Sequence, residues 1–253
     1  MSAVTNWRYL STSVRVASSS VLFATAVAVA ALSLRALALF ALNADVYDLA
    51  TSIEKGTSPD AKYLAAFVSR AGLDRASSNC DNNFTRASLT VNLAALDTAT
   101  AESNAPLTSA ALENAIDSAA RRLACNPLDG NAWLRYAAAA NRAKGSTPAV
   151  VDALRLSYWT TPSEAWILSA RLEFATRLYL AGVTGFEAEY LADLRRFASF
   201  AGVDQVAAAY VDLAPPVRAQ MRPLIETQPE FRRKAIVAEI DRLGVDFTQE
   251  STR

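Results

Sequence analysis

Residues 16–42 form an apolar run in which Arg35 is the only charged side chain. A helix that spans the hydrocarbon core of a bilayer needs about 20 largely apolar residues, and this run is long enough. Arg35 stands towards the C-terminal end of the run, where a long side chain reaches the polar interface. The run therefore predicts a transmembrane helix, and this prediction decides where the rest of the chain lies.

The charges on either side of the run predict its orientation. Arg8 and Arg15 precede it without any acidic residue, whereas Asp45, Asp48 and Glu54 follow it. Short flanks that carry basic residues stay in the cytoplasm. We therefore expect the N-terminus inside the cell and everything after about residue 43 outside.

Two other interpretations of the apolar run are possible, a cleaved signal peptide and a core helix of a soluble protein. A signal peptide has a shorter apolar core, of about 7–15 residues, and small residues before the cleavage point. Cleavage after Ala44 would place Leu42 three residues before the cut, which fits that pattern poorly. The last interpretation is a core helix of a soluble protein. If the run is an anchor or a signal peptide, the rest of the chain is exported across the membrane.

The composition excludes several kinds of function. Lys and Arg number 25 and Asp and Glu also 25, so no basic field indicates a nucleic-acid partner. The chain has no histidine and only two cysteines, which removes the commonest general base and a closed four-cysteine zinc site. We expect neither a metal nor a cofactor.

The sequence of the part expected to be exported, residues 43–253, predicts helices throughout. Turns rich in Gly, Pro, Asn and Ser separate segments of about 12–20 residues, the usual length of globular helices. No stretch alternates apolar and polar residues as a half-buried strand does. At one helix start, Thr161 is expected as N-cap, Pro162 as the first helical residue and Glu164 as a capping-box partner. The predicted fold class is all-α.

One pair of these helices carries a repeat. In NPLDGNAWLRYAAAANRAKGSTPAVVDALRLSYWTTPSEAW, Pro127 recurs as Pro162 and Trp133 as Trp166, at spacings close to about 34 residues. Trp133 and Tyr136 lie three residues apart and are expected to face a partner helix. The pattern resembles the tetratricopeptide-repeat family, with one good repeat between two partial ones. That resemblance implies an array of antiparallel helical hairpins that binds partners.

The domain organisation follows from these segments. We expect a cytoplasmic N-terminus (1–15), a transmembrane helix (16–42), N-terminal periplasmic helices (43–106), tetratricopeptide-like hairpins (107–182), C-terminal capping helices (183–246) and a flexible tail (247–253).

The two cysteines, Cys80 and Cys125, each sit in an Asn-rich turn. An exported location is oxidising, which makes a disulfide between them a candidate. Two separate buried thiols are the alternative.

No catalytic template fits the sequence, so we expect no enzymatic activity. A serine–histidine pair needs histidine, and no phosphate-binding glycine loop is present. A pair of carboxylates can hydrolyse glycosides without histidine, and the candidates are Glu164, Glu173, Glu187 and Glu189. Glu164 is better explained as a helix cap and Glu173 as an ion-pair partner of Arg177.

Four arginines mark a candidate partner groove: Arg171, Arg177, Arg195 and Arg196. With aromatic neighbours they would suit an acidic peptide or a sugar acid. The alternative is a solvated helix face whose arginine stems cover the core.

Together these features predict a single-pass protein of the bacterial inner membrane with its bulk in the periplasm. It would be a non-enzymatic scaffold that binds an envelope protein. Its layout is similar to small anchored repeat proteins of envelope polysaccharide synthesis and export. Alternatively, Ala24, Ala28 and Ala31 form a small-residue stripe of an accessory subunit held through its membrane helix. A hydrolase that uses carboxylates alone is a third hypothesis.

Overall fold

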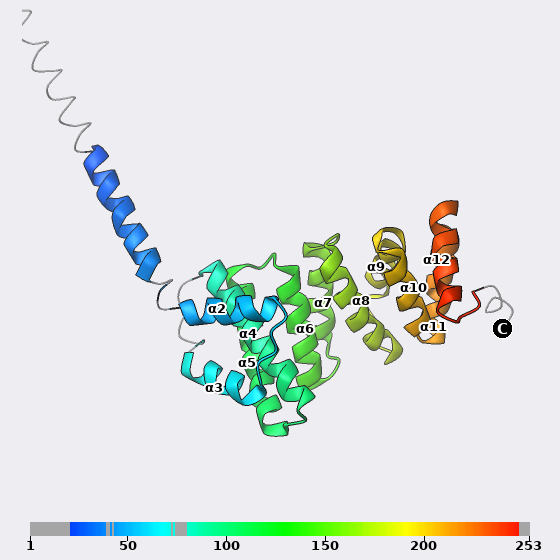
Figure 1. Cartoon of the computed structure of the whole chain (residues 1–253), viewed down its shortest axis with the longest axis horizontal. Helices are drawn as coiled ribbons and strands as arrows, with labels where there is room; N and C mark the ends of the chain where they lie inside the picture. Colours follow the sequence, from blue (N-terminus) through cyan, green and yellow to red (C-terminus); the bar gives the residue numbers. More distant parts are fainter. Residues whose placement is uncertain (1–20, 39–40, 42, 72, 74–79, 248–253) are drawn as a thin grey trace, which may run out of the picture. The chain divides into compact units, whose positions relative to one another are not determined.

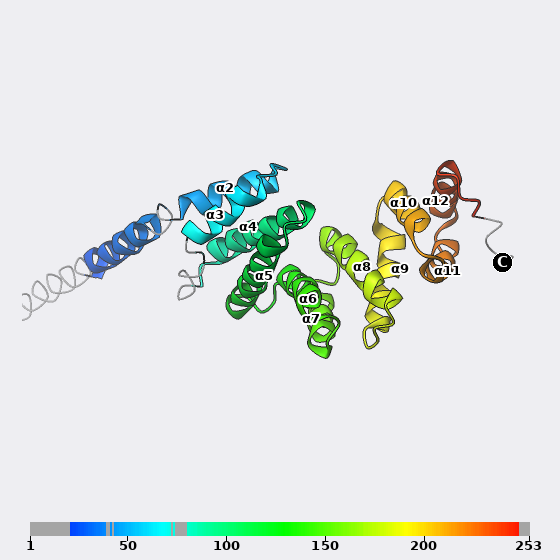
Figure 2. The same ribbon diagram turned by 90° about the horizontal axis from the view of Figure 1, so that it is seen from below.

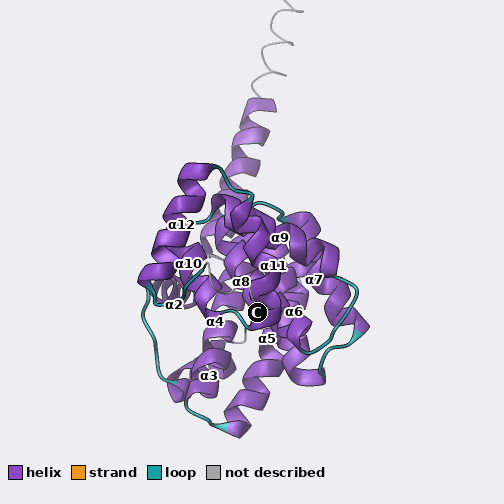
Figure 3. Ribbon diagram, turned by 90° about the vertical axis from the view of Figure 1, so that its right-hand side faces the viewer, coloured by secondary structure: helices purple, strands orange, loops and turns teal. Residues whose placement is uncertain are grey.

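The computed structural model describes residues 21–38, 41, 43–71, 73 and 80–247. Within these ranges the regular structure is entirely helical, with no strand, which confirms the predicted all-α class (Figure 3). The chain divides into two compact units, residues 1–57 and 58–253. Arg8 and Arg15, on which the predicted orientation depends, lie outside the described residues.

The first unit contains the apolar helix Val21–Ala38, whose mean hydropathy is 2.1. Its side chains, including Arg35, are exposed, and it is long and apolar enough to cross a membrane. A signal sequence near the N-terminus passes the same test of helix length and hydropathy. The hydroxyl of Thr25 donates to the carbonyl oxygen of Val21 at 2.8 Å, so this polar group is satisfied within the helix.

Helix α2 (Ala44–Glu54) follows in the same unit. The turn that follows it contains Gly56, which has a φ of 94°, a left-handed conformation that glycine adopts without a steric cost. The hydroxyls of Ser52 and Thr57 lie 2.9 Å apart across this turn.

The second unit is a succession of helices in which neighbours in sequence pack together, α4 with α5, α6 with α7 and α8 with α9 (Figures 1 and 2). Its helices are α3 (Ala61–Ala71), α4 (Asn82–Ala101), α5 (Ala105–Cys125), α6 (Gly130–Lys144), α7 (Pro148–Thr160), α8 (Ala165–Leu180), α9 (Glu187–Phe200), α10 (Val203–Asp212), α11 (Pro215–Glu226) and α12 (Glu230–Arg242).

Short polar side chains begin several of these helices. The carboxylate of Asp81 accepts from the backbone N–H groups of Asn83 and Phe84, and that of Asp129 accepts from Ala132. Such caps satisfy N–H groups that have no partner within the helix. Helix α6 ends at Gly145, whose φ of 74° stops the helix.

The start of α8 differs from the prediction. Thr161 ends α7 instead of beginning α8, and its hydroxyl donates to the carbonyl oxygen of Ser157 at 3.1 Å. Pro162 lies exposed in the intervening turn. The N-cap of α8 is Glu164, whose side chain makes no capping hydrogen bond. The predicted capping box at this point is therefore wrong.

The C-terminal tail also begins later than predicted. Phe247 is buried, its ring centroid 5.3 Å from that of Tyr210. The guanidinium carbon of Arg222 lies 4.5 Å from the centroid of the Phe247 ring. Residue 247 therefore belongs to the packed unit, while residues 248–253 lie outside the described ranges.

Candidate functional site

A groove of about 670 Å³ lies along three helices of the second unit, α4, α6 and α8. Each is the first helix of a packed pair, and α6 also packs against α8. This volume is within the range of about 300–1,000 Å³ that ligand sites occupy. The groove is the candidate functional site.

The floor of the groove is apolar. Leu96 comes from α4, Leu134 from α6, and Phe174 and Leu178 from α8, and all four are buried. Ala138 and Ala139 of α6 also line the groove. Their side chains are small, so they leave the hollow between the helices unfilled.

The rim of the groove carries charge. Arg135, Arg142 and Arg177 line it together with two acids, Asp97 and Glu173. Glu173 and Arg177 form an ion pair of 3.3 Å with both side chains largely in solvent. Arg135 and Arg142 come from α6 and face the single carboxylate of Asp97, so the rim has an excess of positive charge.

The surrounding helices affect two groups of the rim, the guanidinium of Arg135 and the carboxylate of Asp97. The Nε of Arg135 is buried and makes no hydrogen bond within the part of the chain that the structure describes. Asp97 is exposed by its surface area, yet the surrounding helices displace enough water to raise its pKa. Arg135 and Arg142 oppose that rise.

Of the four arginines predicted to line a groove, Arg177 does so and Arg171 does not. Arg195 is exposed on α9, and Arg196 is half-buried beside Asp193. The predicted set of four therefore does not form one site. Sequence reasoning missed Arg135 and Arg142, although their spacing of two helical turns places both on one face of α6.

Arg171 is the centre of a buried network. Its Nε donates to Asp193 at 2.6 Å, and both side chains have no exposed surface. Its Nη1 donates to the carbonyl oxygens of Ser157 at 3.0 Å and Thr161 at 3.1 Å. The guanidinium carbon lies 4.6 Å from the centroid of the Tyr158 ring. Arg171 thus fixes the end of α7 and the middle of α9 to α8, which lines the groove.

In this network, burial and hydrogen bonding act on the pKa of Asp193 in opposite directions. Burial raises the pKa of Asp193, while hydrogen bonds from Arg171 and Arg196 favour the ionised carboxylate. Burial also raises the pKa of Tyr158, and the charge of Asp193 adds to that rise. Removing the charge of Arg171 or of Asp193 alone would leave the other charge buried and uncompensated.

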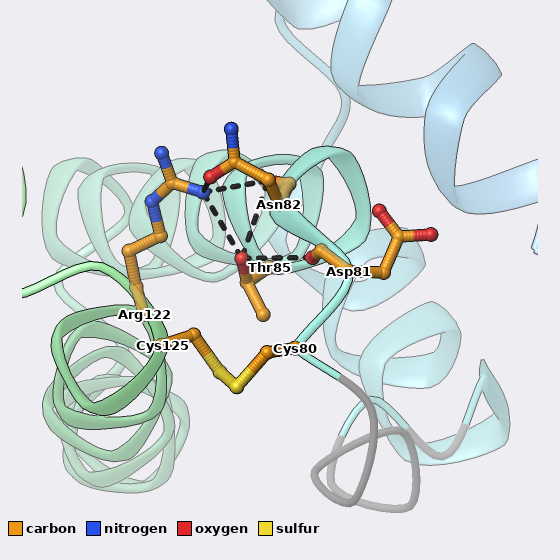
Figure 4. The surroundings of a disulfide bond; sticks show 6 residues. All are labelled: Cys80, Asp81, Asn82, Thr85, Arg122 and Cys125. Atoms are coloured by element: carbon orange, nitrogen blue, oxygen red, sulfur yellow. Dashed lines mark hydrogen bonds between the residues drawn. A yellow bond between two sulfur atoms is a disulfide. The ribbon is translucent and has the colours of Figure 1, made fainter.

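The two cysteines form a disulfide that joins the start of α4 to the end of α5 (Figure 4). Their Cα atoms lie 5.2 Å apart, within bridging range. Beside it, Arg122 donates to the backbone carbonyl and the side-chain oxygen of Asn82 and to Thr85 (Figure 4). Its Nε contacts Asp129, the N-cap of α6, at 2.7 Å.

The repeat-packing residues divide into two groups. Trp133 and Tyr136 are half-buried, with ring centroids 6.4 Å apart in an edge-on arrangement, and the Trp133 indole N–H donates to the carbonyl oxygen of Pro127 at 2.8 Å. Trp166, in contrast, is exposed. Its expected packing role is therefore wrong. Trp166 lies in the first turn of α8, where Ala165 before it is exposed as well.

The candidate carboxylates have separate roles. Glu173 pairs with Arg177, Glu189 accepts from Arg155 at 3.2 Å, and Glu187 accepts from the N–H of Gly185 at 2.8 Å. That backbone hydrogen bonding lowers the pKa of Glu187. In the described ranges, no three His, Cys, Asp or Glu side chains are grouped to hold a metal ion.

Comparison with known proteins adds no family assignment: no protein-family model, curated protein or solved structure matches this chain.

Proposed function

We propose that the chain is a non-enzymatic, membrane-anchored scaffold whose groove along α4, α6 and α8 holds a segment of an envelope protein. The observation that carries this proposal is the groove itself, because three successive helix pairs each contribute one helix to it. Surfaces built by stacked helical units are extended, and extended surfaces suit elongated partner segments. A tetratricopeptide-like array has this arrangement.

The chemistry of the groove indicates the kind of segment. Glu173 already neutralises Arg177, which leaves Arg135 and Arg142 against Asp97. Carboxylates on a partner would form charge-assisted hydrogen bonds with these two guanidinium groups. The apolar floor would take aliphatic or aromatic side chains. The proposed ligand is therefore a protein segment with apolar residues beside an acidic one.

The proposed setting is the bacterial inner membrane. The Val21–Ala38 helix serves as an uncleaved anchor, with the N-terminus in the cytoplasm and the second unit in the periplasm. The disulfide supports this setting, since disulfides persist in oxidising compartments. Among envelope partners, proteins of polysaccharide synthesis and export rank first, on the similarity in layout to anchored repeat proteins.

Photo-crosslinking in membranes tests the groove. A photoreactive amino acid at Ser146, which lines the groove, should capture a discrete partner that mass spectrometry identifies. The matched control is the same amino acid at Asp152, which is exposed on α7 and does not line the groove. Equal capture from both positions would contradict a groove-specific partner.

Charge variants then test the chemistry. In the Ser146 background, Arg135→Gln with Arg142→Gln should lower capture about tenfold or more, because each charge-assisted hydrogen bond contributes about 1.5–3 kcal/mol. Asp97→Asn should raise capture, since it removes the carboxylate that competes for the same arginines. Unchanged capture in both variants would mean that the partner does not use these charges.

An accessory subunit held through the membrane helix is the second candidate. Ala24, Ala28 and Ala31 share one face of the Val21–Ala38 helix and are exposed. Small residues at this spacing are typical of helices that pack in lipid. Replacing the helix by an unrelated anchor should abolish co-purification with the complex if this candidate holds, and should leave crosslinking through the groove unchanged if it does not.

A further inference from the structure

Five large apolar side chains stand out from the surface of the second unit. Among its described residues they are the most exposed of their kind: Leu128 73%, Trp159 61%, Trp166 60%, Phe200 83% and Phe231 79%. Each lies in or beside one of four connections, α5–α6, α7–α8, α9–α10 and α11–α12. These are alternate connections along the chain, so the distribution follows the helix order. We call these five residues the apolar edge.

The first two connections touch. A Cβ atom added to Gly130, at the start of α6, would lie 2.0 Å from Oγ1 of Thr161 and 2.7 Å from Oγ1 of Thr160. The turn that carries Leu128 therefore lies against the turn between Trp159 and Trp166.

The third connection lies at the same end of the helices. Arg171 of α8 contacts Asp193 of α9, and Thr176 further along α8 contacts Tyr190 earlier in α9, at 2.8 Å between their hydroxyls. The two helices are thus antiparallel, so the start of α8 with Trp166 is level with the end of α9.

The fourth connection touches the third. Arg232 donates to the carbonyl oxygens of Ala198 at 2.9 Å and Ala201 at 2.6 Å. Gln228 donates to the hydroxyl of Ser199 at 3.2 Å. Phe231 is therefore held near Phe200, and the five residues of the apolar edge share one end of the helix array.

Basic side chains accompany the apolar edge. The guanidinium carbon of Arg155 lies 5.1 Å from the centroid of the Trp159 ring, while its Nε pairs with Glu189 at 3.2 Å. Around Phe200 and Phe231 the chain carries Arg195, Arg196, Arg232, Arg233 and Lys234. Asp193 in this region is buried and pairs with Arg171 and Arg196, and Glu230 pairs with Lys234 at 2.7 Å. Asp204, at the start of α10, is an exposed carboxylate in the same region. The exposed Arg195 and Arg233 still give an excess of positive charge beside the two phenylalanines.

This combination matches the interface of a lipid bilayer better than a protein groove. Protruding Trp, Phe and Leu side chains insert singly among headgroups, where tryptophan is enriched, and nearby arginines meet lipid phosphates. Residues 39–57 are all that separate the candidate span from the second unit, so a short tether holds the unit at a high local concentration of lipid. We propose that the apolar edge docks on the membrane surface as a second lipid contact, an inference that rests on the proposed anchor.

Tryptophan quenching by brominated lipid tests this docking. The full chain with Trp7→Phe and Trp133→Phe keeps Trp159 and Trp166 as its only reporters. In vesicles of phosphatidylcholine and phosphatidylglycerol, their emission should shift to shorter wavelength and fall when the lipids carry bromine. In the matched control all four tryptophans become phenylalanine and Leu180→Trp moves the reporter to the opposite end of α8, where the emission should not fall.

Exposed positions allow a second variant. Phe200→Ser with Phe231→Ser removes two apolar side chains that are largely exposed and pack little against the rest of the unit, so the helical circular-dichroism signal should persist. Bromine quenching of Trp159 and Trp166 should decrease, because two of the proposed lipid contacts are lost. Equal quenching at both ends of α8, or none at Trp159 and Trp166, overturns the docking. A wavelength shift without bromine quenching that grows with protein concentration would instead assign the edge to contact between copies. If the chain fails to float with the vesicles after alkaline washing, the anchor itself is wrong.

Discussion

Replacing Asp193 by asparagine should lower the free energy of unfolding by about 3–5 kcal/mol, the usual cost of removing one partner of a buried ion pair. The asparagine keeps the shape of the side chain but leaves the guanidinium of Arg171 without a countercharge in a site that has no exposed surface. Arg196 also loses its partner, at 3.0 Å. Urea denaturation followed by the helical circular-dichroism signal measures the change.

Two further variants show what kind of interaction is lost. Glu173→Gln breaks the exposed pair with Arg177 and should cost only about 0–1 kcal/mol. Replacing the buried pair by Arg171→Met with Asp193→Leu should recover part of the loss, because both uncompensated charges are then absent. Recovery should be incomplete, since Arg171 also donates to two carbonyl oxygens at the end of α7. A loss in Asp193→Asn no larger than in Glu173→Gln would contradict the buried network.

Removing the disulfide should have an effect of comparable size. The cysteines are 45 residues apart, and closing a loop of this length contributes about 4 kcal/mol in the chain-entropy model, with measured losses of about 2–5 kcal/mol. Cys80→Ala with Cys125→Ala should therefore unfold at a lower urea concentration than the parent chain. The network of Arg122 with Asn82 and Asp129 remains, so the same helix ends stay in contact in the folded state.

Reduction provides the control for the disulfide. A thiol reductant should destabilise the parent chain by the same amount as the double replacement and should not affect the double variant. If the reductant leaves the parent unchanged, the two cysteines are not bridged in the isolated protein.

The helical class could be predicted from the sequence because helix starts, turns and segment lengths are local properties. The cysteine pairing could also be predicted, since a chain with two cysteines allows one intramolecular bridge. The groove could not be predicted, because Asp97, Arg135 and Arg177 come from three helices that only the packing brings together. Their common position depends on which face of each helix points inward.

Arg171 marks another limit of sequence reasoning. Arg171 and Arg177 lie on the same helix with similar neighbours, yet one is buried and the other largely exposed. The difference is set by Asp193, which is 22 residues from Arg171 in the sequence and reaches it from α9. Trp166 was also misplaced, because α8 begins three residues later than predicted, with Glu164 instead of Thr161 as its N-cap, and this puts the indole in an exposed first turn.

An intact-mass measurement of the membrane-extracted chain, before and after protease is added to spheroplasts, tests the anchor and the exported unit together. Before protease we expect the mass of the complete chain. Afterwards we expect loss of the second unit and survival of an N-terminal fragment that contains Val21–Ala38. A chain that begins near Asp45 before protease, or a complete chain that survives protease, would contradict an uncleaved anchor that carries an exported helical scaffold.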